Sequence, residues 1–349
     1  MITLDEICTW ENLLEASRGT RLGRRSSPAI ATHEYNLESD LMHLRGQLVA
    51  QTYRPGGYHS FYVHDPKRRL ISAAPVRDRV VHHALCNLLE PEFDRSFVRE
   101  SFANRCAMGT HAAVDHCQML ARRFRFALQC DVRQFFPSID HDILRAILFR
   151  KVKEPRARAL IDLIIAGGAD IGPPPAETIY FPGDDLFAVC RPRGLPIGNL
   201  TSQIWANCYL SPFDHFVKRE LRCIGYVRYV DDIIFFADDK PTLWKWKAAA
   251  EARLASLRLA IHPGAHPRPV TEGLPFLGFI VFPERRRLKS RKATHFARRV
   301  RALIATLGER DRRIVGMVKG WMAHASHANT IGLQKSVLKR LGLRRGDFL

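Results

Sequence analysis

The sequence lacks long hydrophobic runs, paired cysteines and low-complexity tracts. No apolar run approaches the roughly 18 residues that a membrane-spanning helix needs, and Asp5 and Glu6 near the N-terminus exclude a secretory signal. The eight cysteines include no Cys-x-x-Cys pair, which argues against a zinc cluster and indicates reduced thiols in a cytosol-like compartment. We therefore expect a cytoplasmic protein with no membrane partner.

Acidic residues are few compared with basic ones. The 349 residues include 54 Lys plus Arg against 35 Asp plus Glu, a formal charge of +19. Residues 285–301 alone carry nine Lys or Arg and no acidic residue. A polyanion is the natural partner, and nucleic acid is favoured over a membrane because no amphipathic anchor is evident. Contacts to phosphates give salt-dependent affinity without sequence information.

The composition, 46% hydrophobic and 26% charged, is that of a globular protein with a sizeable core. Helix-like and strand-like segments alternate irregularly without a fixed repeat, so we expect an α+β fold rather than a doubly wound sheet. The expected strands are 58–70, 126–130, 226–230, 233–237 and 276–282. The expected helices are 38–51, 78–89, 112–124, 202–221, 242–259, a helix from a cap at Asp140 to about 152, and a basic C-terminal region. Residues 17–27 are polar and basic, and 166–193, rich in Gly and Pro, are expected to form a loop or hairpin.

Two adjacent aspartates, Asp231 and Asp232, lie between two apolar runs, which predicts a tight hairpin with both carboxylates at its turn. Two carboxylates about 4 Å apart repel by about 4 kcal/mol at an effective dielectric near 20, unless a cation or solvent relieves them. Oxygen ligands of this kind suit Mg²⁺. Asp-Asp is also a common turn dipeptide, and most such pairs are simply solvated.

A third carboxylate, Asp131, immediately follows the apolar run 126–130. If that strand and the hairpin are neighbours in one antiparallel sheet, the three carboxylates meet at its edge. The simpler interpretation of Asp131 is a surface acid that precedes a helix.

Together, Asp131, Asp231 and Asp232 resemble the catalytic carboxylates of reverse transcriptases. Tyr229-Val-Asp-Asp232 resembles that family's Tyr-x-Asp-Asp box. The resemblance implies that the three aspartates, with Val132 beside them, hold Mg²⁺, and that the backbone after Asp131 helps to cradle phosphate. Two metal ions held there would polarise an attacking 3′-hydroxyl and neutralise the leaving pyrophosphate.

Asp131-x-x-x-Phe135-Phe136 resembles the family's first carboxylate motif. The resemblance implies that Phe136 is the aromatic gate that rejects a ribose 2′-hydroxyl, with Phe135 next to it in the nucleotide site. The alternative is that both phenylalanines are core, and we expect this of one of them.

Further blocks follow in the family's order, over about residues 20 to 345. Residues 66–79 resemble the fingers block of the group II intron-like branch, which implies that Lys67 and Arg69 bind the triphosphate. The segment that begins at Arg105 resembles the second block, but Met108 stands where a lysine is usual. Residues 276–279 resemble the primer grip, and 320–330 the thumb helices. The template–primer contacts implied in this way are Arg105, Tyr229, Gly278, Lys289, Arg291 and Lys292.

Residues 194–203 indicate which subfamily of reverse transcriptases the chain resembles. Most reverse transcriptases carry Gln-Gly and then Ser-Pro here, whereas this chain has Ile197-Gly198 and Ser202-Gln203. That variant is similar to the reverse transcriptases of diversity-generating retroelements, which copy a template RNA with frequent errors opposite adenine. Near the nucleotide, Ile197 cannot supply the hydrogen bond of a glutamine, which weakens discrimination by about 1 kcal/mol or more. Taken alone, Ile197 would be ordinary packing.

The resemblance implies a right-hand polymerase: an N-terminal extension (1–57), fingers (58–127, with 160–195 inserted), palm (128–284) and a helical thumb (285–349). It implies an RNA-directed DNA polymerase that uses template RNA, a DNA primer and deoxynucleoside triphosphates, together with a small basic accessory protein, in mutagenic retrohoming. The alternatives are an ordinary-fidelity group II-like or phage-defence reverse transcriptase, and a catalytically idle RNA-binding scaffold.

One departure from the family concerns the segment 262–267, which lacks the usual lysine after His-Pro, a candidate acid for pyrophosphate. His266 or a water molecule could take that role, since histidine exchanges protons near neutral pH. We found no nuclease or zinc-binding segment after the thumb region, so we expect integration or template degradation to need other proteins.

Overall fold

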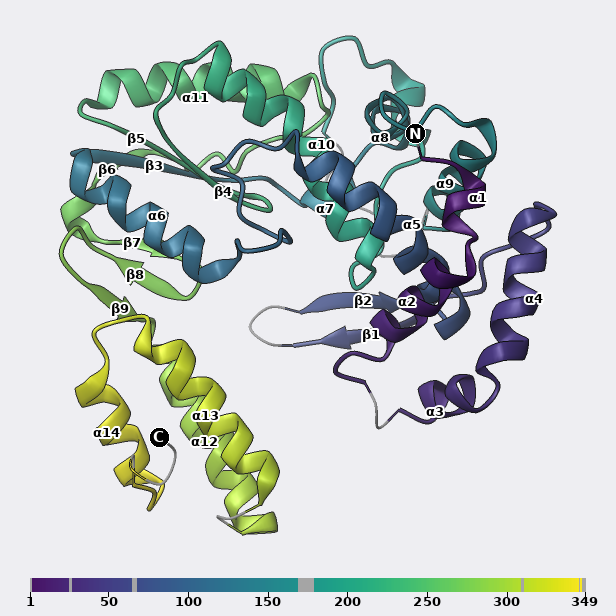
Figure 1. The fold of residues 1–349 in the computed structure, drawn as a ribbon. Coiled ribbons are helices and arrows are strands. Elements are labelled where there is room, and N and C mark those ends of the chain that lie inside the picture. Colours follow the sequence, from purple (N-terminus) through teal and green to yellow (C-terminus); the bar gives the residue numbers. More distant parts are fainter. Residues whose placement is uncertain are drawn as a thin grey trace.

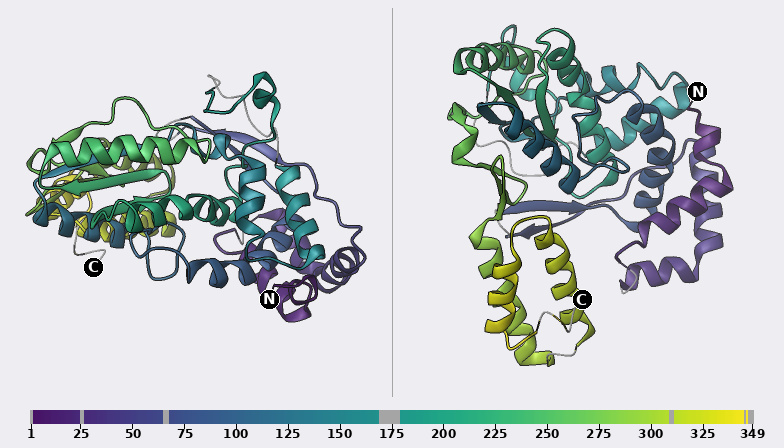
Figure 2. Two further views of the ribbon diagram at one scale, coloured as in Figure 1. Left: turned by 90° about the horizontal axis from the view of Figure 1, so that it is seen from above. Right: turned by 60° about the vertical axis from the view of Figure 1, so that its left-hand side comes forward.

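The computed structural model describes residues 2–24, 27–64, 68–168, 179–308, 311–344 and 346. A helical part, a central antiparallel sheet and a C-terminal helical bundle follow one another across the molecule (Figure 1). The bundle lies beneath the sheet, and a long β-hairpin extends from the helical part toward the bundle's side (Figure 2). The expected α+β class is therefore confirmed.

The central sheet has the order β4-β5-β3-β6 and is antiparallel throughout. Its strands are β3 (Phe126–Asp131), β4 (Gly225–Tyr229), β5 (Asp232–Ala237) and β6 (Pro267–Pro269). Alternate side chains enter different cores: Ile233 and Phe235 of β5 pack on one face, while Ile234 and Phe236 pack on the other. This period of two fixes the register, because a one-residue slip would exchange the two faces.

Helices cover both faces of the sheet (Figure 1). On one side lies α11 (Lys240–Ala255), which contacts β3, β5 and β6. On the other side lies α6 (Thr110–Arg123), which contacts β4 and β8 through Val114, Cys117 and Ala121. Helix α6 falls in the segment predicted as fingers, yet its apolar side packs in the same core as the sheet.

A second, three-stranded sheet of β7 (Leu274–Phe276), β8 (Phe279–Val281) and β9 (Arg286–Leu288) continues the chain. The single strand predicted over 276–282 is wrong, because the chain reverses at Leu277 and Gly278. Both residues have positive φ, 46° and 93°. This is the type I′ pattern of two-residue hairpins, which glycine adopts at no steric cost.

The helical part contains the residues predicted as an N-terminal extension. These form α1 (Leu4–Ile7), α2 (Trp10–Thr20), α3 (Pro28–Tyr35) and α4 (Leu37–Val49). The first three contact α5 (Val76–Asp94), and α4 contacts α1 and α3. Leu13 of α2, Leu41 of α4 and Val81 of α5 lie in one buried cluster. The N-terminal segment is therefore part of the main core.

Between α4 and α5, β1 (His59–Val63) and β2 (Arg69–Ala73) form the protruding hairpin where one strand-like segment was expected. The strand β1 is exposed along its whole length.

The middle of the chain adds α7 (Phe135–Ser138), α8 (His141–Leu148), α9 (Pro155–Gly167), the 3-10 helix η1 (Leu186–Cys190) and α10 (Leu200–Arg219). The predicted cap at Asp140 is confirmed: its carboxylate accepts from the N–H groups of Asp142 at 3.0 Å and Ile143 at 3.1 Å. Helix α8 ends at Leu148, before the predicted end near 152. Part of the loop predicted at 166–193 lies outside the described residues.

The C-terminal bundle consists of α12 (Ser290–Leu307), α13 (Arg312–Ser326) and α14 (Ile331–Arg340) around a core of its own. Arg286 joins this bundle to the rest of the molecule. Its guanidinium forms an ion pair with Asp115 of α6 at 2.6 Å and donates to Gln118 at 2.8 Å. Its backbone N–H donates to the Asn329 side chain at 3.0 Å, in the link between α13 and α14. Within the described ranges, no helix is both long and apolar enough to cross a membrane.

Candidate active site

The structure brings the three predicted carboxylates to one edge of the central sheet. Asp131, the last residue of β3, pairs directly with Asp232, the first residue of β5. Tyr229 at the end of β4 pairs with Asp232 from the other side. The N–H of Val132 donates to the carbonyl of Asp231 at 3.4 Å. The expected adjacency of the β3 strand and the Asp-Asp hairpin is therefore present.

The hairpin turn is one residue earlier than the sequence pattern suggested. Val230 and Asp231 form the loop, because Asp232 already belongs to β5. Only Val230 of this pair has a positive φ, 56°. That pattern resembles a type II′ turn, in which glycine normally occupies the first central position. A β-branched residue in that conformation is strained and needs support from its surroundings.

The electrostatics of this edge disfavour negative charge in the absence of a cation. Burial raises the pKa of the Asp231 carboxyl above its usual range, and the nearby negative charge of Asp131 raises it further. The positive charges of Arg69 and Arg228 act in the opposite direction. A bound cation would remove this conflict between the carboxylates.

The chemistry of the donors fits Mg²⁺. Among the residues that the structure describes, no three His, Cys, Asp or Glu side chains form a ready-made metal site. Mg²⁺ does not require one, because it keeps several waters and takes one or two carboxylates plus substrate phosphates. Asp131, Asp231 and Asp232 supply only oxygen donors at this edge, as Mg²⁺ prefers.

The peptide after Asp131 leaves the strand through Gln134, whose φ is 45°, and enters α7. Phe135 is 2% exposed and lies in the core, whereas Phe136 is half-buried at the edge of that core. Their rings are 5.5 Å apart in an edge-on arrangement. The expectation that one of the two phenylalanines is core therefore holds for Phe135.

The segment without the family lysine runs beside the carboxylate edge. The N–H of His262 donates to the carbonyl of Asp131 at 2.9 Å, and the N–H of Arg133 donates to Ala260 at 2.8 Å. His266 is exposed, and its Nδ1 lies 2.9 Å from the carbonyl of Gly264. Residues 260–262 thus extend the sheet along β3.

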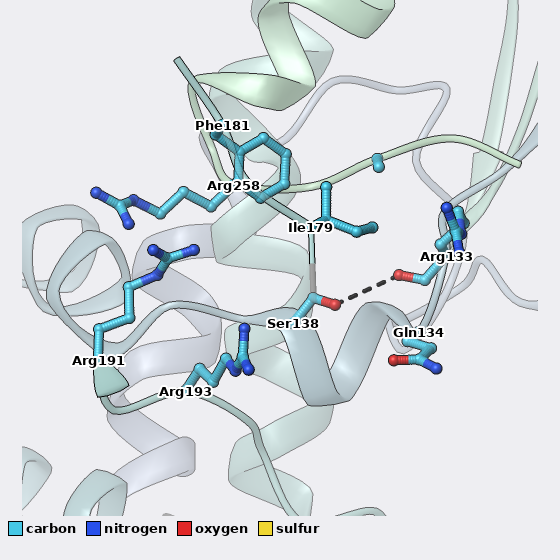
Figure 3. A pocket seen from close by; sticks show the side chains of 9 residues that line it. Arg133, Gln134, Ser138, Ile179, Phe181, Arg191, Arg193 and Arg258 are labelled. Atoms are coloured by element: carbon cyan, nitrogen blue, oxygen red, sulfur yellow. Dashed lines mark hydrogen bonds between the residues drawn. The ribbon is translucent and has the colours of Figure 1, made fainter. Parts of the chain in front are cut away.

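A pocket beyond this segment is lined by Arg133, Arg191, Arg193 and Arg258 (Figure 3). Two of these guanidinium groups already have buried anionic partners. Arg191 lies 2.9 Å from the carboxylate of Asp140, and Arg258 lies 2.9 Å from that of Asp184. The first ion pair ties the segment around η1 to the start of α8, and the second ties it to the chain that follows α11.

The block that suggested the subfamily lies against the β1–β2 hairpin. The carbonyl of Ile197 accepts from the N–H of Ser72 in β2 at 2.9 Å. Gly198 has a φ of 119°, and a Cβ added there would lie 3.0 Å from the Ile71 side chain, so glycine is needed. Gly198 and Gln203 line a cleft together with α2 and α5.

Two further residues, Arg69 and Lys67, were predicted to bind the nucleotide. Arg69 is exposed at the start of β2, and its charge acts on Asp231. Lys67 lies outside the described residues.

The predicted template–primer residues lie in different environments. Arg105 is turned inward: its side chain is 7% exposed and bonds to Asp94 at 2.5 Å and to the carbonyls of Val98 and Ser101 at 2.7 and 2.8 Å. In this structure it holds its own loop, and its contact with nucleic acid stays a prediction.

Tyr229 shares a 3.1 Å hydrogen bond with Thr110. The carbonyl of Gly278 accepts from the N–H of Lys289 at 3.2 Å, which places the expected primer grip beside the start of α12. Arg291 and Lys292 lie in the first turn of α12.

Sequence reasoning missed Arg228, which lies directly beneath the Asp-Asp hairpin between β4 and β5. Its guanidinium is fully buried and donates to the carbonyl of Val230 at 3.0 Å. The sequence did contain a signal, since Arg228 is a lone charged residue within an apolar strand. A buried charge needs a partner, so such a residue indicates a polar network around it.

Comparison with known proteins identifies the family. The model of the family described as reverse transcriptase (RNA-dependent DNA polymerase) matches residues 64–281, more than half of the chain. The chain belongs to the reverse transcriptase family. The matched range of this reverse transcriptase domain includes both the β3 aspartate and the Asp-Asp hairpin, and family membership agrees with the expected right-hand arrangement.

Two curated proteins are similar to this chain at less than 30% sequence identity. The chain is 24% identical over 189 residues to Protein YkfC of Escherichia coli (strain K12), across 52% of this chain and 46% of that protein. It is 29% identical over 152 residues to an uncharacterized 91 kDa protein in a cob intron of Schizosaccharomyces pombe, across 44% of this chain and 17% of that protein. The chain thus spans less than half the length of either relative.

Among solved structures, apo telomerase from Candida tropicalis is similar with a TM-score of 0.47 and 12% identity, over 67% of this chain and 55% of that one.

Proposed function

We propose that this reverse transcriptase domain is an active RNA-directed DNA polymerase that extends a DNA primer on a template RNA with deoxynucleoside triphosphates. The observation that carries the proposal is the direct pairing of Asp131 with Asp232, next to Asp231, at one sheet edge. Retention of all three carboxylates argues against the idle scaffold. The formal charge of +19 supports a nucleic-acid partner.

In this mechanism Asp131, Asp231 and Asp232, with Val132 beside them, hold Mg²⁺. The ion, when bound, offsets negative charge on the phosphates and lowers the pKa of the attacking 3′-hydroxyl. Arg69 binds the triphosphate from β2, together with Lys67, and the backbone after Asp131 cradles phosphate. The Phe136 ring limits space beside the sugar. Lys289, Arg291 and Lys292 hold the template–primer, with residues 285–349 as thumb, 128–284 as palm and 58–127, with 160–195 inserted, as fingers.

For the subfamily we propose an enzyme that is error-prone at adenine, as in mutagenic retrohoming, and that works with a small basic accessory protein. Support comes from the Ile197-Gly198 and Ser202-Gln203 pattern. The Ile197 carbonyl is tied to β2, so the backbone of Ile197 lies where β2 and the 194–203 block meet. The alternative is an ordinary-fidelity group II-like enzyme, which the relative in the cob intron favours.

Primer extension on an RNA template with Mg²⁺ tests the activity. Wild-type protein should extend the primer, and Asp231→Asn should lose at least about 100-fold in rate, as loss of a principal charge-stabilising group does. Since burial and Asp131 disfavour a charged Asp231, the variant should be at least as heat-stable as wild type in the absence of metal. Full activity of Asp231→Asn, or no extension by wild type with accessory protein supplied, would contradict the proposal.

Sequencing of the cDNA separates the two subfamilies. On an adenine-rich template, an excess of errors at adenine is expected, and Ile197→Gln should reduce it. An error rate at adenine equal to that at the other bases would instead support the group II-like alternative.

A further inference from the structure

Arg228 is surrounded by protein at the base of the Asp-Asp hairpin. Its side chain is 0% exposed, and its five N–H groups have five recorded acceptors. Nε and Nη2 donate to the two oxygens of Asp214 at 2.7 Å each, and Nη2 also donates to Ser101 at 2.8 Å. Nη1 donates to Asn207 at 3.2 Å and to the carbonyl of Val230 at 3.0 Å. Every donor is therefore used.

Such a network is not needed for stability alone. A buried ion pair often stabilises a protein no better than apolar residues of the same volume, because both charges lose their hydration. What a planar guanidinium adds is geometry, since its donors point in fixed directions. Arg228 uses one of them on the loop that carries Asp231.

The loop is a place where such a constraint is required. Val230 has a φ of 56°, a conformation that costs of the order of 1–3 kcal/mol for a residue of this kind and persists only when neighbours enforce it. The backbone of Arg228 is itself fixed: its N–H donates to the carbonyl of Glu100 at 2.8 Å, and its carbonyl accepts from Phe102 at 3.0 Å. Arg228 therefore connects a rigid base to a strained turn.

Resting on the proposed function, we propose that Arg228 is a positioning residue for metal binding: it holds the Val230 carbonyl so that Asp231 and Asp232 face Asp131. The carboxylate of Asp214, with Asn207 and Ser101, holds the guanidinium in turn. The role is indirect, since Arg228 is buried away from substrate.

Tyr226 provides a matched control within the same network. It lies on β4 two residues before Arg228, is fully buried, and donates through its hydroxyl to Asp214 at 2.6 Å. Its recorded hydrogen bonds do not reach the turn. Tyr226→Phe should therefore weaken the network without releasing Val230, whereas Arg228→Lys keeps the charge beside Asp214 but loses the planar arm to Val230.

The test measures Mn²⁺ binding by electron paramagnetic resonance, without primer, template or nucleotide, together with kcat, KM and the Mg²⁺ dependence of primer extension. Arg228→Lys should weaken Mn²⁺ binding and lower kcat by about 10-fold or more, as is usual when an outer partner of a metal ligand is lost. Tyr226→Phe should lower the melting temperature but leave Mn²⁺ affinity within about twofold of wild type.

A rescue variant separates positioning from general stability. Glycine takes a positive φ without strain, so Val230→Gly added to Arg228→Lys should recover part of the lost Mn²⁺ affinity. If Arg228→Lys does not fold, the double variant Arg228→Gln with Asp214→Asn removes both buried charges together and also lacks the arm to Val230. It should show the same loss.

Wild-type Mn²⁺ affinity in either folded Arg228 variant, or an equal loss in Tyr226→Phe, would overturn the inference. Primer extension is read separately. If wild type does not extend a primer while Arg228→Lys still loses Mn²⁺ affinity, the proposed polymerase activity fails and the positioning role stands.

Discussion

At the scale of single residues, Phe135 and Phe136 show how neighbouring identical side chains take different roles. Phe135 is 2% exposed and packs in the main core, whereas Phe136 is half-buried, five residues after Asp131. Packing therefore accounts for the first ring. The second lies where the proposed function places the sugar of the incoming nucleotide.

We predict that Phe136→Ala lowers the preference for deoxynucleotides over ribonucleotides by about 10-fold or more, because a steric contact with the 2′-hydroxyl is removed. Its stability should change little compared with Phe135→Ala, which should lose about 3–5 kcal/mol as a buried phenylalanine does. Single-nucleotide incorporation and urea unfolding measure the two effects. Unchanged sugar selectivity in Phe136→Ala would show that Phe136 is not the steric gate.

Which residues form the candidate site could be predicted only in part from the sequence. Asp131, Asp231 and Asp232 were found because their motifs are local and each follows or divides an apolar strand. Arg228 was missed because its partners, Asp214 and Ser101, belong to other segments, and a sequence pattern does not show which distant side chains meet a buried charge.

At the scale of elements, the continuous strand and helix segments were predicted well, whereas places where the chain reverses direction were not. The strand at 126–130 and the helix at 202–221 are present within one or two residues, since the first is a continuous apolar run and the second a long helical segment. The segment 276–282 was wrong because Leu277 adopts a positive φ, which its residue type does not suggest. Helix α2 was missed because its last turn, residues 17–20, belongs to the polar and basic stretch 17–27, which shows no apolar period.

Helix α5 contains a histidine that should make the helical part sensitive to acid. Burial lowers the pKa of His82 from 6.5 to about 4, although the charge of Asp78 opposes this shift. Below pH 6.5 the unfolded chain takes up a proton at this residue and the folded chain does not, so the unfolded state binds more protons and stability falls with falling pH. The effect spans pH 6.5 to about 4.

We predict that His82→Gln loses less stability than wild type between pH 7 and pH 5, as measured by urea unfolding. His59→Gln, a change on the exposed strand β1, is the control and should keep the wild-type pH dependence. An identical pH dependence in His82→Gln and wild type would show that this histidine does not contribute.

At the scale of the whole molecule, Arg286 is the residue that links the bundle α12–α14 to α6 through both its side chain and its backbone. Its side chain contacts Asp115 and Gln118 of α6, and its backbone contacts Asn329 in the link before α14. Loss of hydrogen bonds to a charged group costs about 1.5–3 kcal/mol each, so Arg286 contributes to this junction beside the apolar contact of Ala325 and the stacked rings of His111 and His327.

We predict that Arg286→Ala shortens the products made in a single binding event and speeds dissociation of the template–primer. Addition of the first nucleotide in enzyme excess should remain near the wild-type rate. Arg287→Ala removes the same charge from the neighbouring exposed position and is the matched control. Equal product lengths in the two variants would mean that charge, and not the junction, determines retention.

The pairing of Asp131 with Asp232 also has a consequence during synthesis of the chain. About a hundred residues separate these partners, so β3 leaves the ribosome long before β5 exists to cover its edge. At roughly 5–20 residues per second, the wait is about 5 to 20 s. During that time the helices before β3 can already pack, while the apolar strand 126–130 remains open to association with other chains. The carboxylate edge is thus assembled late, and a chain interrupted before residue 232 has no active site.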